Sequence, residues 1–161
     1  MTEFSMPSTR KLWVTLAAVA LAAALAQEAA CRRQDARVVE APEAERVRIG
    51  AFMSLTGDTA QYGISALNGI RMAVEEANAA GGAGGRRVEL IVQDTRSDVA
   101  ETGVVVEKLA REERVHALLG EVVSSRSLAA AHVAQRERVP VLTPSATSPD
   151  VTAAGDYVFR S

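Results

Sequence analysis

Short apolar runs alternate with longer helical segments through most of this chain. The apolar runs occupy residues 47–53, 88–93, 115–119 and 139–142. Short runs of this kind between turn signals are typical of strands buried inside a sheet. A β-α-β-α-β-α-β order with short connections calls for a parallel sheet with right-handed crossovers. The sequence therefore predicts an α/β fold in which helices flank a Rossmann-like parallel sheet.

The first helical segment carries apolar residues at the three- and four-residue spacing of a helix that buries one face. The positions are Ile64, Leu67, Ile70 or Arg71, Val74, and Ala77 or Asn78, with Met72 and Ala73 widening the face. The segment ends at Ala80, and the glycines that follow supply a positive-φ cap. Residues 81–85 are glycine-rich, but they follow a helix and precede a strand, which is the reverse of a dinucleotide-binding loop. We therefore expect a flexible connection here and no phosphate site.

The second helical segment begins at Asp98, a good N-cap residue, and Glu101 completes a capping-box pattern. Its apolar face consists of Val105, Leu109 and either Val106 or Ala110. The third segment is alanine-rich and spans residues 125–135. Residues 157–161 predict the beginning of another strand, with no closing helix after it. We therefore expect an incomplete domain.

The amino-terminal stretch is best set apart from the fold. Arg10 and Lys11 precede an uncharged apolar run over residues 12–26, which is short for a membrane span. The run ends in Ala24-Leu25-Ala26, a small-x-small pattern that fits a signal-peptide cleavage site. A helix of the fold would have a polar face, which this run lacks. We therefore expect residues 1–26 to be a signal peptide that directs export.

Cys31 is the only cysteine of the chain, so it cannot form an internal disulfide. Ala29-Ala30-Cys31 resembles the end of a bacterial lipoprotein signal, in which case the leader is residues 1–30 and Cys31 carries the lipid. Glu28 departs from that pattern, and the alternative is a free thiol after cleavage at Ala26. Residues 27–46 are charged and without sustained period, which predicts a disordered tether before a folded domain at residues 47–161.

Composition and chemistry argue against several functions. A chain of 161 residues with a net charge of −2 has no cluster of Lys and Arg, which disfavours nucleic-acid binding. It lacks the G-x-S-x-G nucleophile motif, and His116 and His132 have no partners at the spacing that a base or a metal requires. Turn chemistry explains Asp94, and helix capping explains Asp98. We expect no catalytic residue, no metal and no cofactor.

Two hydroxyl-rich turns follow the third and fourth predicted strands. Ser124 and Ser125 open the third helix, and residues 143–149 include Ser145 and Thr147. Ligands of open α/β sheets bind at the carboxyl ends of the strands. A helix start favours a carboxylate, whereas a threonine hydroxyl beside a backbone carbonyl can accept from an ammonium group. Together the turns suit a zwitterion such as an amino acid; the alternatives are a serine that only caps the helix and a rigid turn before a short helix.

From residue 47 to 161 the chain resembles the amino-terminal lobe of periplasmic binding proteins for branched-chain amino acids, the type I solute-binding proteins of ABC importers. The matching stretches are RIGAFMSLTGDTAQYG, NGIRMAVEEANAAGG, GRRVELIVQDTRSD, LLGEVVSSRSLAAA, and VPVLTPSATSPDVT with YVFRS. The resemblance implies a type I fold with its second lobe missing here. It further implies amino-acid binding between two lobes and delivery to ABC permease subunits. The expected location is the periplasm or cell envelope, with membrane contact only through a possible anchor at Cys31.

The resemblance also assigns roles to residues of both turns. Ser124 would bind the ligand carboxylate, the Ser145 carbonyl and the Thr147 hydroxyl and N–H would hold the head group, and Tyr62 would line the side-chain pocket. Val99 stands where relatives usually carry proline, at a helix start away from the site. The same fold also serves as the extracellular sensor domain of signalling receptors, which is the second hypothesis. An α/β enzyme is the third, disfavoured because the chain shows no nucleophile, base or cofactor loop.

Overall fold

A computed structural model describes residues 46–161. The predicted signal peptide, Cys31 and almost all of the predicted tether lie outside the described residues. The tether prediction was wrong by one residue at its end, because Arg46 is already the first residue of β1 and pairs with Arg87.

The described residues form one parallel sheet, which confirms the predicted α/β class. Its strands lie in the order β2-β1-β3-β4-β5, and every neighbouring pair is parallel. Their bounds are β1 Arg46–Met53, β2 Arg87–Asp94, β3 Ala117–Leu119, β4 Val141–Thr143 and β5 Val158–Arg160. The predicted last strand is therefore present, as the edge strand β5.

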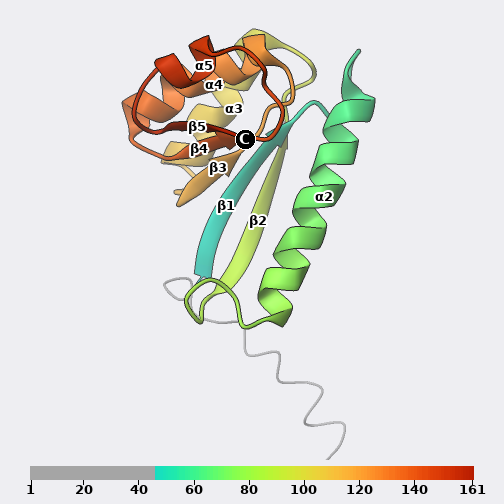
Figure 1. The fold of residues 1–161 in the computed structure, drawn as a ribbon, viewed down its shortest axis with the longest axis vertical. Coiled ribbons are helices and arrows are strands. Elements are labelled where there is room, and N and C mark those ends of the chain that lie inside the picture. The colour runs from blue at the N-terminus through green and yellow to red at the C-terminus, as the bar shows by residue number, and fades with distance from the viewer. Residues whose placement is uncertain (1–45) are drawn as a thin grey trace, which may run out of the picture. The chain divides into compact units, whose positions relative to one another are not determined.

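Helices cover both faces of the sheet (Figure 1). They are α2 Ala60–Ala79, α3 Val99–Arg111, α4 Ser124–Glu137 and the short α5 Asp150–Ala153. Helix α2 contacts β1 and β2, whereas α3 and α4 pack against each other on the other face, with α5 beside α4 and β5. Within residues 46–161, none of these helices combines the length and the apolar character that a membrane crossing requires.

Strand β1 contributes to a core on each face of the sheet because successive side chains of a strand point to opposite sides. Phe52 packs with Val106, Leu109 and Leu118 in the cluster that α3 and α4 cover. Met53, with Ala51, packs against Leu67 of α2. Burial on both faces explains why the strand sequence shows no polar alternation.

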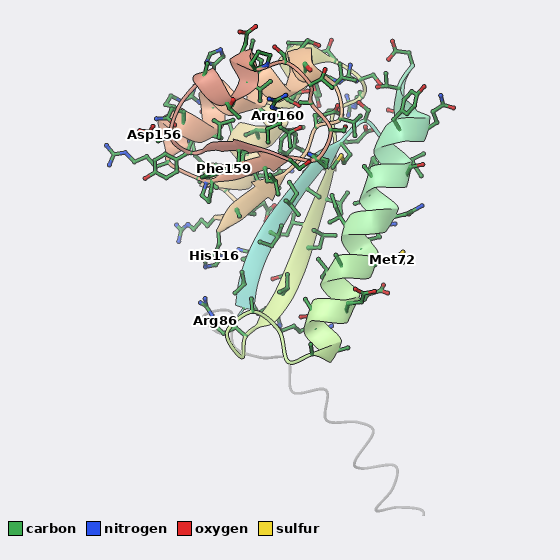
Figure 2. The ribbon with its side chains drawn as sticks, in the orientation of Figure 1. Met72, Arg86, His116, Asp156, Phe159 and Arg160 are labelled. Carbon is green, nitrogen blue, oxygen red and sulfur yellow. The ribbon has the colours of Figure 1, made fainter. Side chains whose placement is uncertain are left out.

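The predicted apolar face of α2 was partly wrong. Leu67 is buried and Ile70 and Val74 are partly buried, as predicted, but Ile64 is 46% exposed and Met72 is 61% exposed. Figure 2 shows Met72 on the side of α2 that faces away from the strands. The main contacts of α2 are with β1 and β2, so it buries a narrower stripe than its sequence offers.

The second helix begins as predicted. The Asp98 carboxylate accepts a hydrogen bond from the backbone N–H of Glu101 at 2.7 Å. The carboxylate of Glu101 lies 3.9 Å from Arg96. Val105, Val106 and Leu109 are buried, which selects Val106 over Ala110 as the third member of the apolar face.

Strands β3 and β4 each begin two residues later than predicted. The backbone N–H of Val115 donates to Leu109 and that of Val139 donates to Ala134, so both residues complete the preceding helix end. The glycine-rich segment connects α2 to β2, as predicted, and within it Ala83 and Arg86 pair across a tight reverse turn.

Candidate functional site

The order of the strands reverses direction between β1 and β3. From β1 the chain proceeds outward to β2, and from β3 it proceeds outward the other way to β4 and β5. The loops that leave the carboxyl ends of β1 and β3 therefore diverge to opposite faces, which opens a crevice between them. Open α/β sheets bind their ligands at such a switch point.

A cavity of about 420 Å³ lies at this crevice. Three segments line it: the first turns of α2, the residues between β3 and α4, and the loop after β4. The lining residues are Thr59, Tyr62, Ser65, Ala66, Val122, Val123 and Ser145. Its volume falls within the range of small-molecule sites in proteins.

The cavity wall combines apolar surface with hydroxyl groups. The Tyr62 ring, which is 60% exposed, Ala66 and two valines supply the apolar part. Thr59, Ser65 and Ser145 supply hydroxyls, and none of the lining residues carries a charged side chain. A wall of this kind fits an uncharged, largely apolar group.

Ser124 joins the two hydroxyl-rich turns. Its Oγ accepts hydrogen bonds from the backbone N–H groups of Thr147 at 3.1 Å and of Ser148 at 3.2 Å. It is the first residue of α4, and the N-cap position belongs to Val123. The interpretation of Ser124 as a simple helix cap was therefore wrong.

The loop after β4 is held at several points. The Ser145 hydroxyl donates to the carbonyl of Val122 at 3.1 Å, and the Arg160 guanidinium donates to the carbonyl of Thr147 at 2.6 Å. Ser148 accepts from the N–H of Asp150, at the start of α5. The short helix expected after residues 143–149 is present as α5, but its N-cap residue Pro149 makes no side-chain cap hydrogen bond.

The structure thus places the five predicted ligand residues at one edge of the sheet, and four of them form two pairs. Tyr62 and Ser145 line the cavity, and Ser124 lies against Thr147 through its hydroxyl. Ser125 is exposed on the first turn of α4. The structure therefore brings Tyr62 to Ser145 and Ser124 to Thr147, while Ser125 is outside the residues that line the cavity.

Sequence reasoning missed a buried ion pair that is hydrogen-bonded to the cavity-lining residues Val122 and Val123. The Glu121 side chain is 0% exposed, and its Oε2 accepts from the Arg126 Nε at 3.1 Å. The carboxylate also accepts from the hydroxyls of Ser54 at 2.6 Å and Thr95 at 3.0 Å. The available signal was two opposite charges inside the otherwise apolar and small stretch LLGEVVSSRS.

Burial raises the pKa of Glu121, but hydrogen bonds from Ser54 and Arg126 and the charge of Arg126 together outweigh it. The pKa of this carboxyl therefore lies below its usual value. Glu121 is therefore charged at neutral pH, and both of its carboxylate oxygens accept hydrogen bonds.

Two glycines permit the close approach of segments at the site. A Cβ on Gly63 would lie 2.0 Å from the Ser54 carbonyl oxygen, so only glycine lets α2 approach the end of β1. Gly120 has φ of +143°, and its Cβ would lie 1.9 Å from the Phe52 carbonyl oxygen. These close backbone approaches position the cavity-lining residues that follow each glycine, which are Ser65 and Ala66 after Gly63 and Val122 and Val123 after Gly120.

Asp94 closes its own turn, as predicted, by accepting a hydrogen bond from the backbone N–H of Arg96 at 2.8 Å, and it also holds the loop after β1. It accepts hydrogen bonds from the backbone N–H groups of Leu55 at 2.8 Å and Thr56 at 3.2 Å, and from the Thr56 hydroxyl at 2.7 Å. Burial raises the pKa of Asp94, but these hydrogen bonds, together with one from the Arg96 N–H, lower the pKa by more than burial raises it. The net shift is therefore downward.

The histidines lie away from the cavity. His116, just before β3, accepts a hydrogen bond from the backbone N–H of Arg48 at 3.1 Å. Figure 2 shows it at the opposite end of the strands from Arg160. His132 is exposed on α4. Among residues 46–161, no three His, Cys, Asp or Glu side chains gather as a metal site.

Comparison with known protein families gives one match that spans the described chain. The family model described as "Periplasmic binding protein" matches residues 46–161. The chain is 34% identical over 119 residues to the leucine-, isoleucine-, valine-, threonine- and alanine-binding protein of Pseudomonas aeruginosa. It is 29% identical over 112 residues to the Leu/Ile/Val-binding protein of Escherichia coli. These alignments cover 73% and 70% of this chain but only 32% and 30% of the relatives.

Solved structures give a consistent result. The branched-chain amino acid transporter substrate-binding protein LivJ of Streptococcus pneumoniae, in complex with isoleucine, has a TM-score of 0.70 at 35% identity. The leucine-binding protein LivK of Thermotoga maritima has a TM-score of 0.67 at 36% identity. The similarity covers 71% of this chain in both cases, and 33% and 32% of the two neighbours. The chain thus spans about a third of the length of the proteins it matches.

Proposed function

We propose, because this chain belongs to the periplasmic binding protein family, that it is the ligand-binding part of an extracytoplasmic solute-binding protein of an ABC importer. Its ligand would be an amino acid, with branched-chain side chains preferred, and its partner would be the membrane permease. The cavity at the switch point, with Tyr62 on one wall and Ser145 on another, carries the proposal. No catalytic step is part of it.

The cavity wall supports a preference for aliphatic side chains. The lining residues offer a tyrosine ring, an alanine and two valines without a charged group. A charged ligand side chain would lose its hydration there without a partner, at a cost of several kcal/mol. Leucine, isoleucine and valine would lose only apolar hydration, which favours binding. The relatives named for leucine, isoleucine and valine support this choice.

The Ser124 hydroxyl is suited to the ligand carboxylate. A serine hydroxyl has one donor and two acceptor lone pairs. The N–H groups of Thr147 and Ser148 occupy the acceptor side, so the hydroxyl proton is available for an anionic acceptor. Ser125, on the same helical turn, would add a second donor. The Ser145 carbonyl and the Thr147 hydroxyl would complete the head-group site from the loop after β4.

A second lobe is part of the proposal. Micromolar affinity requires about 8 kcal/mol net, and association costs at least about 4 kcal/mol before any contact contributes. A few charge-assisted hydrogen bonds from one lobe, at about 1.5–3 kcal/mol each, do not supply both the net binding free energy and the association cost. The relatives are about three times as long as the aligned segment, which supports a further α/β lobe in the natural protein. Residues 47–161 would be its amino-terminal lobe.

The proposed location is the periplasm or cell envelope, in keeping with the family. The signal peptide over residues 1–26, or 1–30 with lipidated Cys31, remains a prediction. Mass spectrometry of the mature amino terminus tests it, because a diacylated Cys31 and a free Gln27 differ in mass.

Isothermal calorimetry on the full natural protein tests the function. We expect leucine, isoleucine and valine to bind with micromolar or tighter affinity, and lysine and glutamate to bind far more weakly. Absence of heat for every amino acid, with a folded protein, would refute the proposal.

A further inference from the structure

We propose that the buried Glu121–Arg126 pair is the positioning centre of the binding site, which fixes the cavity walls without contacting the ligand. The inference rests on the proposed function for the identity of the ligand. Neither residue lines the cavity, yet the side-chain hydrogen bonds of the pair reach two of the three segments that do, and the third segment is bonded to the backbone of residues 121–122.

Glu121 holds the wall between β3 and α4. One oxygen of its carboxylate, Oε2, accepts from the backbone N–H groups of Val122 at 3.0 Å and Val123 at 3.3 Å, both cavity residues. The other oxygen, Oε1, accepts from Ser54 and Thr95, which directly follow β1 and β2. A single carboxylate thus fixes this wall to the ends of two strands.

Arg126 holds the wall formed by α2. Its guanidinium donates to Glu121 through Nε, to the Ser97 carbonyl through Nη1 at 3.2 Å, and to the Thr59 hydroxyl through Nη2 at 2.6 Å. Thr59 is the N-cap residue of α2 and lines the cavity. Tyr62 follows it by one turn, so the position of the tyrosine depends on this anchor.

The third wall is joined through the backbone of the same segment. Ser145 donates to the Val122 carbonyl, and Thr143 donates to the Glu121 carbonyl at 2.6 Å. Ser127 donates to that carbonyl as well, at 3.0 Å. The loop after β4 is therefore fixed to residues 121–122, and these residues are fixed by the ion pair.

Stability alone gives a weak reason for such a pair. Desolvation of two charges offsets most of their attraction, and apolar replacements of buried pairs are often neutral or stabilising. A requirement for geometry gives a stronger reason, because binding sites need their contacting groups held by a supporting shell of hydrogen bonds. The planar guanidinium satisfies three partners in fixed directions, which a lysine ammonium does not.

The variant Arg126→Lys separates geometry from charge. It keeps the positive charge beside Glu121 but loses the fork that reaches Ser97 and Thr59. We expect ligand affinity of the full natural protein to fall about tenfold or more. The reason is that Ser97 and Thr59 each lose a hydrogen bond from a charged group. We also expect faster amide hydrogen exchange in residues 55–62 and 120–124 without ligand. Arg111→Lys is the matched control, because Arg111 bonds to Glu137 on the surface at 2.9 Å, and both measurements should stay at wild-type values.

Ser97→Ala keeps the test decisive if Arg126→Lys does not fold. Its hydroxyl bonds to the Thr59 N–H at 3.3 Å and Oγ1 at 3.0 Å from outside the cavity. The hydroxyl also donates to the Thr56 carbonyl at 2.8 Å. The variant therefore loses three neutral hydrogen bonds, and we expect affinity to fall about tenfold or more. Wild-type affinity and wild-type exchange in the folded variants would overturn the inference. If wild-type protein bound no amino acid, the proposed function would fail, whereas the exchange rates would still decide whether the pair fixes the walls.

Discussion

The Ser124 hydroxyl oxygen lies 3.1 Å from the backbone nitrogen of Thr147, from which it accepts a hydrogen bond. This contact joins the start of α4 to the loop after β4 and places the two hydroxyl-rich turns at one edge of the sheet. A serine that accepts two backbone N–H groups has its own proton directed elsewhere. The bond thus serves the fold, and it leaves the hydroxyl proton available for the proposed contact with a ligand carboxylate.

Ser124→Ala should weaken both stability and binding. The N–H groups of Thr147 and Ser148 lose their acceptor, and we expect a loss of about 1 kcal/mol in the free energy of unfolding. Affinity for leucine should fall by about tenfold or more, because the variant removes the proposed donor to the carboxylate. Urea denaturation and calorimetry measure the two effects. Thr152→Ala on α5 is the control, with an exposed hydroxyl that bonds within its own turn; equal affinities of the two variants would contradict the assignment.

Tyr62→Ala should change selectivity and leave the fold intact. The side chain is 60% exposed, so we expect the free energy of unfolding to change by no more than about 0.5 kcal/mol. Affinity should fall more for leucine than for alanine, because in the proposed site only the larger side chain would reach the ring. Calorimetry with both ligands measures the ratio. Tyr62→Phe keeps the ring and should bind nearly as wild type; an equal loss in both variants would instead assign the effect to the hydroxyl.

Glu121→Gln should be strongly destabilising at pH 7. It leaves the Arg126 guanidinium, which is 7% exposed, without its counter-charge, and removal of one member of a buried pair costs about 3–5 kcal/mol. Chemical denaturation checks the value. The double variant Glu121→Gln with Arg126→Leu should recover part of the stability, since the orphaned charge is gone; no recovery would mean that the charge of Arg126 is not the cause.

Stability should decrease as the pH falls below about 4.5. The folded-state pKa of Glu121 is below the ordinary 4.5, and that of Glu137, hydrogen-bonded to Arg111 and Arg136, is lowered to about 2. A depressed carboxyl pKa contributes stability above the unfolded-state pKa, and this contribution is lost as the pH falls through the folded-state pKa. Thermal melts from pH 7 to pH 2 follow the loss. High salt should reduce the contribution of the surface residue Glu137 and spare that of the buried Glu121, so Glu137→Gln should remove most of the salt sensitivity.

Gly63→Ala should displace the start of α2. The new Cβ would lie 2.0 Å from the Ser54 carbonyl oxygen, so the helix must move away from the end of β1. We expect weaker ligand binding together with lower stability, measured by calorimetry and thermal melts. Gly69→Ala is the matched control on the same helix, because its Cβ meets nothing within 4 Å. That variant should gain about 0.5–1 kcal/mol in stability and bind as wild type. A Gly63→Ala variant that melts at the wild-type temperature would contradict the packing.

The sequence predicted the order of the elements and the edge at which the site lies, because strand periodicity and turn chemistry are local properties. It did not predict Glu121 and Arg126 as a supporting pair, because their partners Ser54 and Thr59 lie 67 residues away in each case. The exposure of Ile64 and Met72 was missed for a similar reason. A helix sequence shows which residues are apolar, whereas the number of strands beneath it decides how many of them are buried.

The reversal of strand order has a consequence for the way the site is assembled during synthesis. The first part of the fold to leave the ribosome, β1-α2-β2, carries Thr59 and Tyr62 but neither of the facing walls. Strand β3 must then dock on the free edge of β1, and Ser145 arrives only after β4. A nascent or partly folded chain therefore has one wall of the cavity and no enclosed site, so a ligand of this cavity has no complete site to bind while the first half folds.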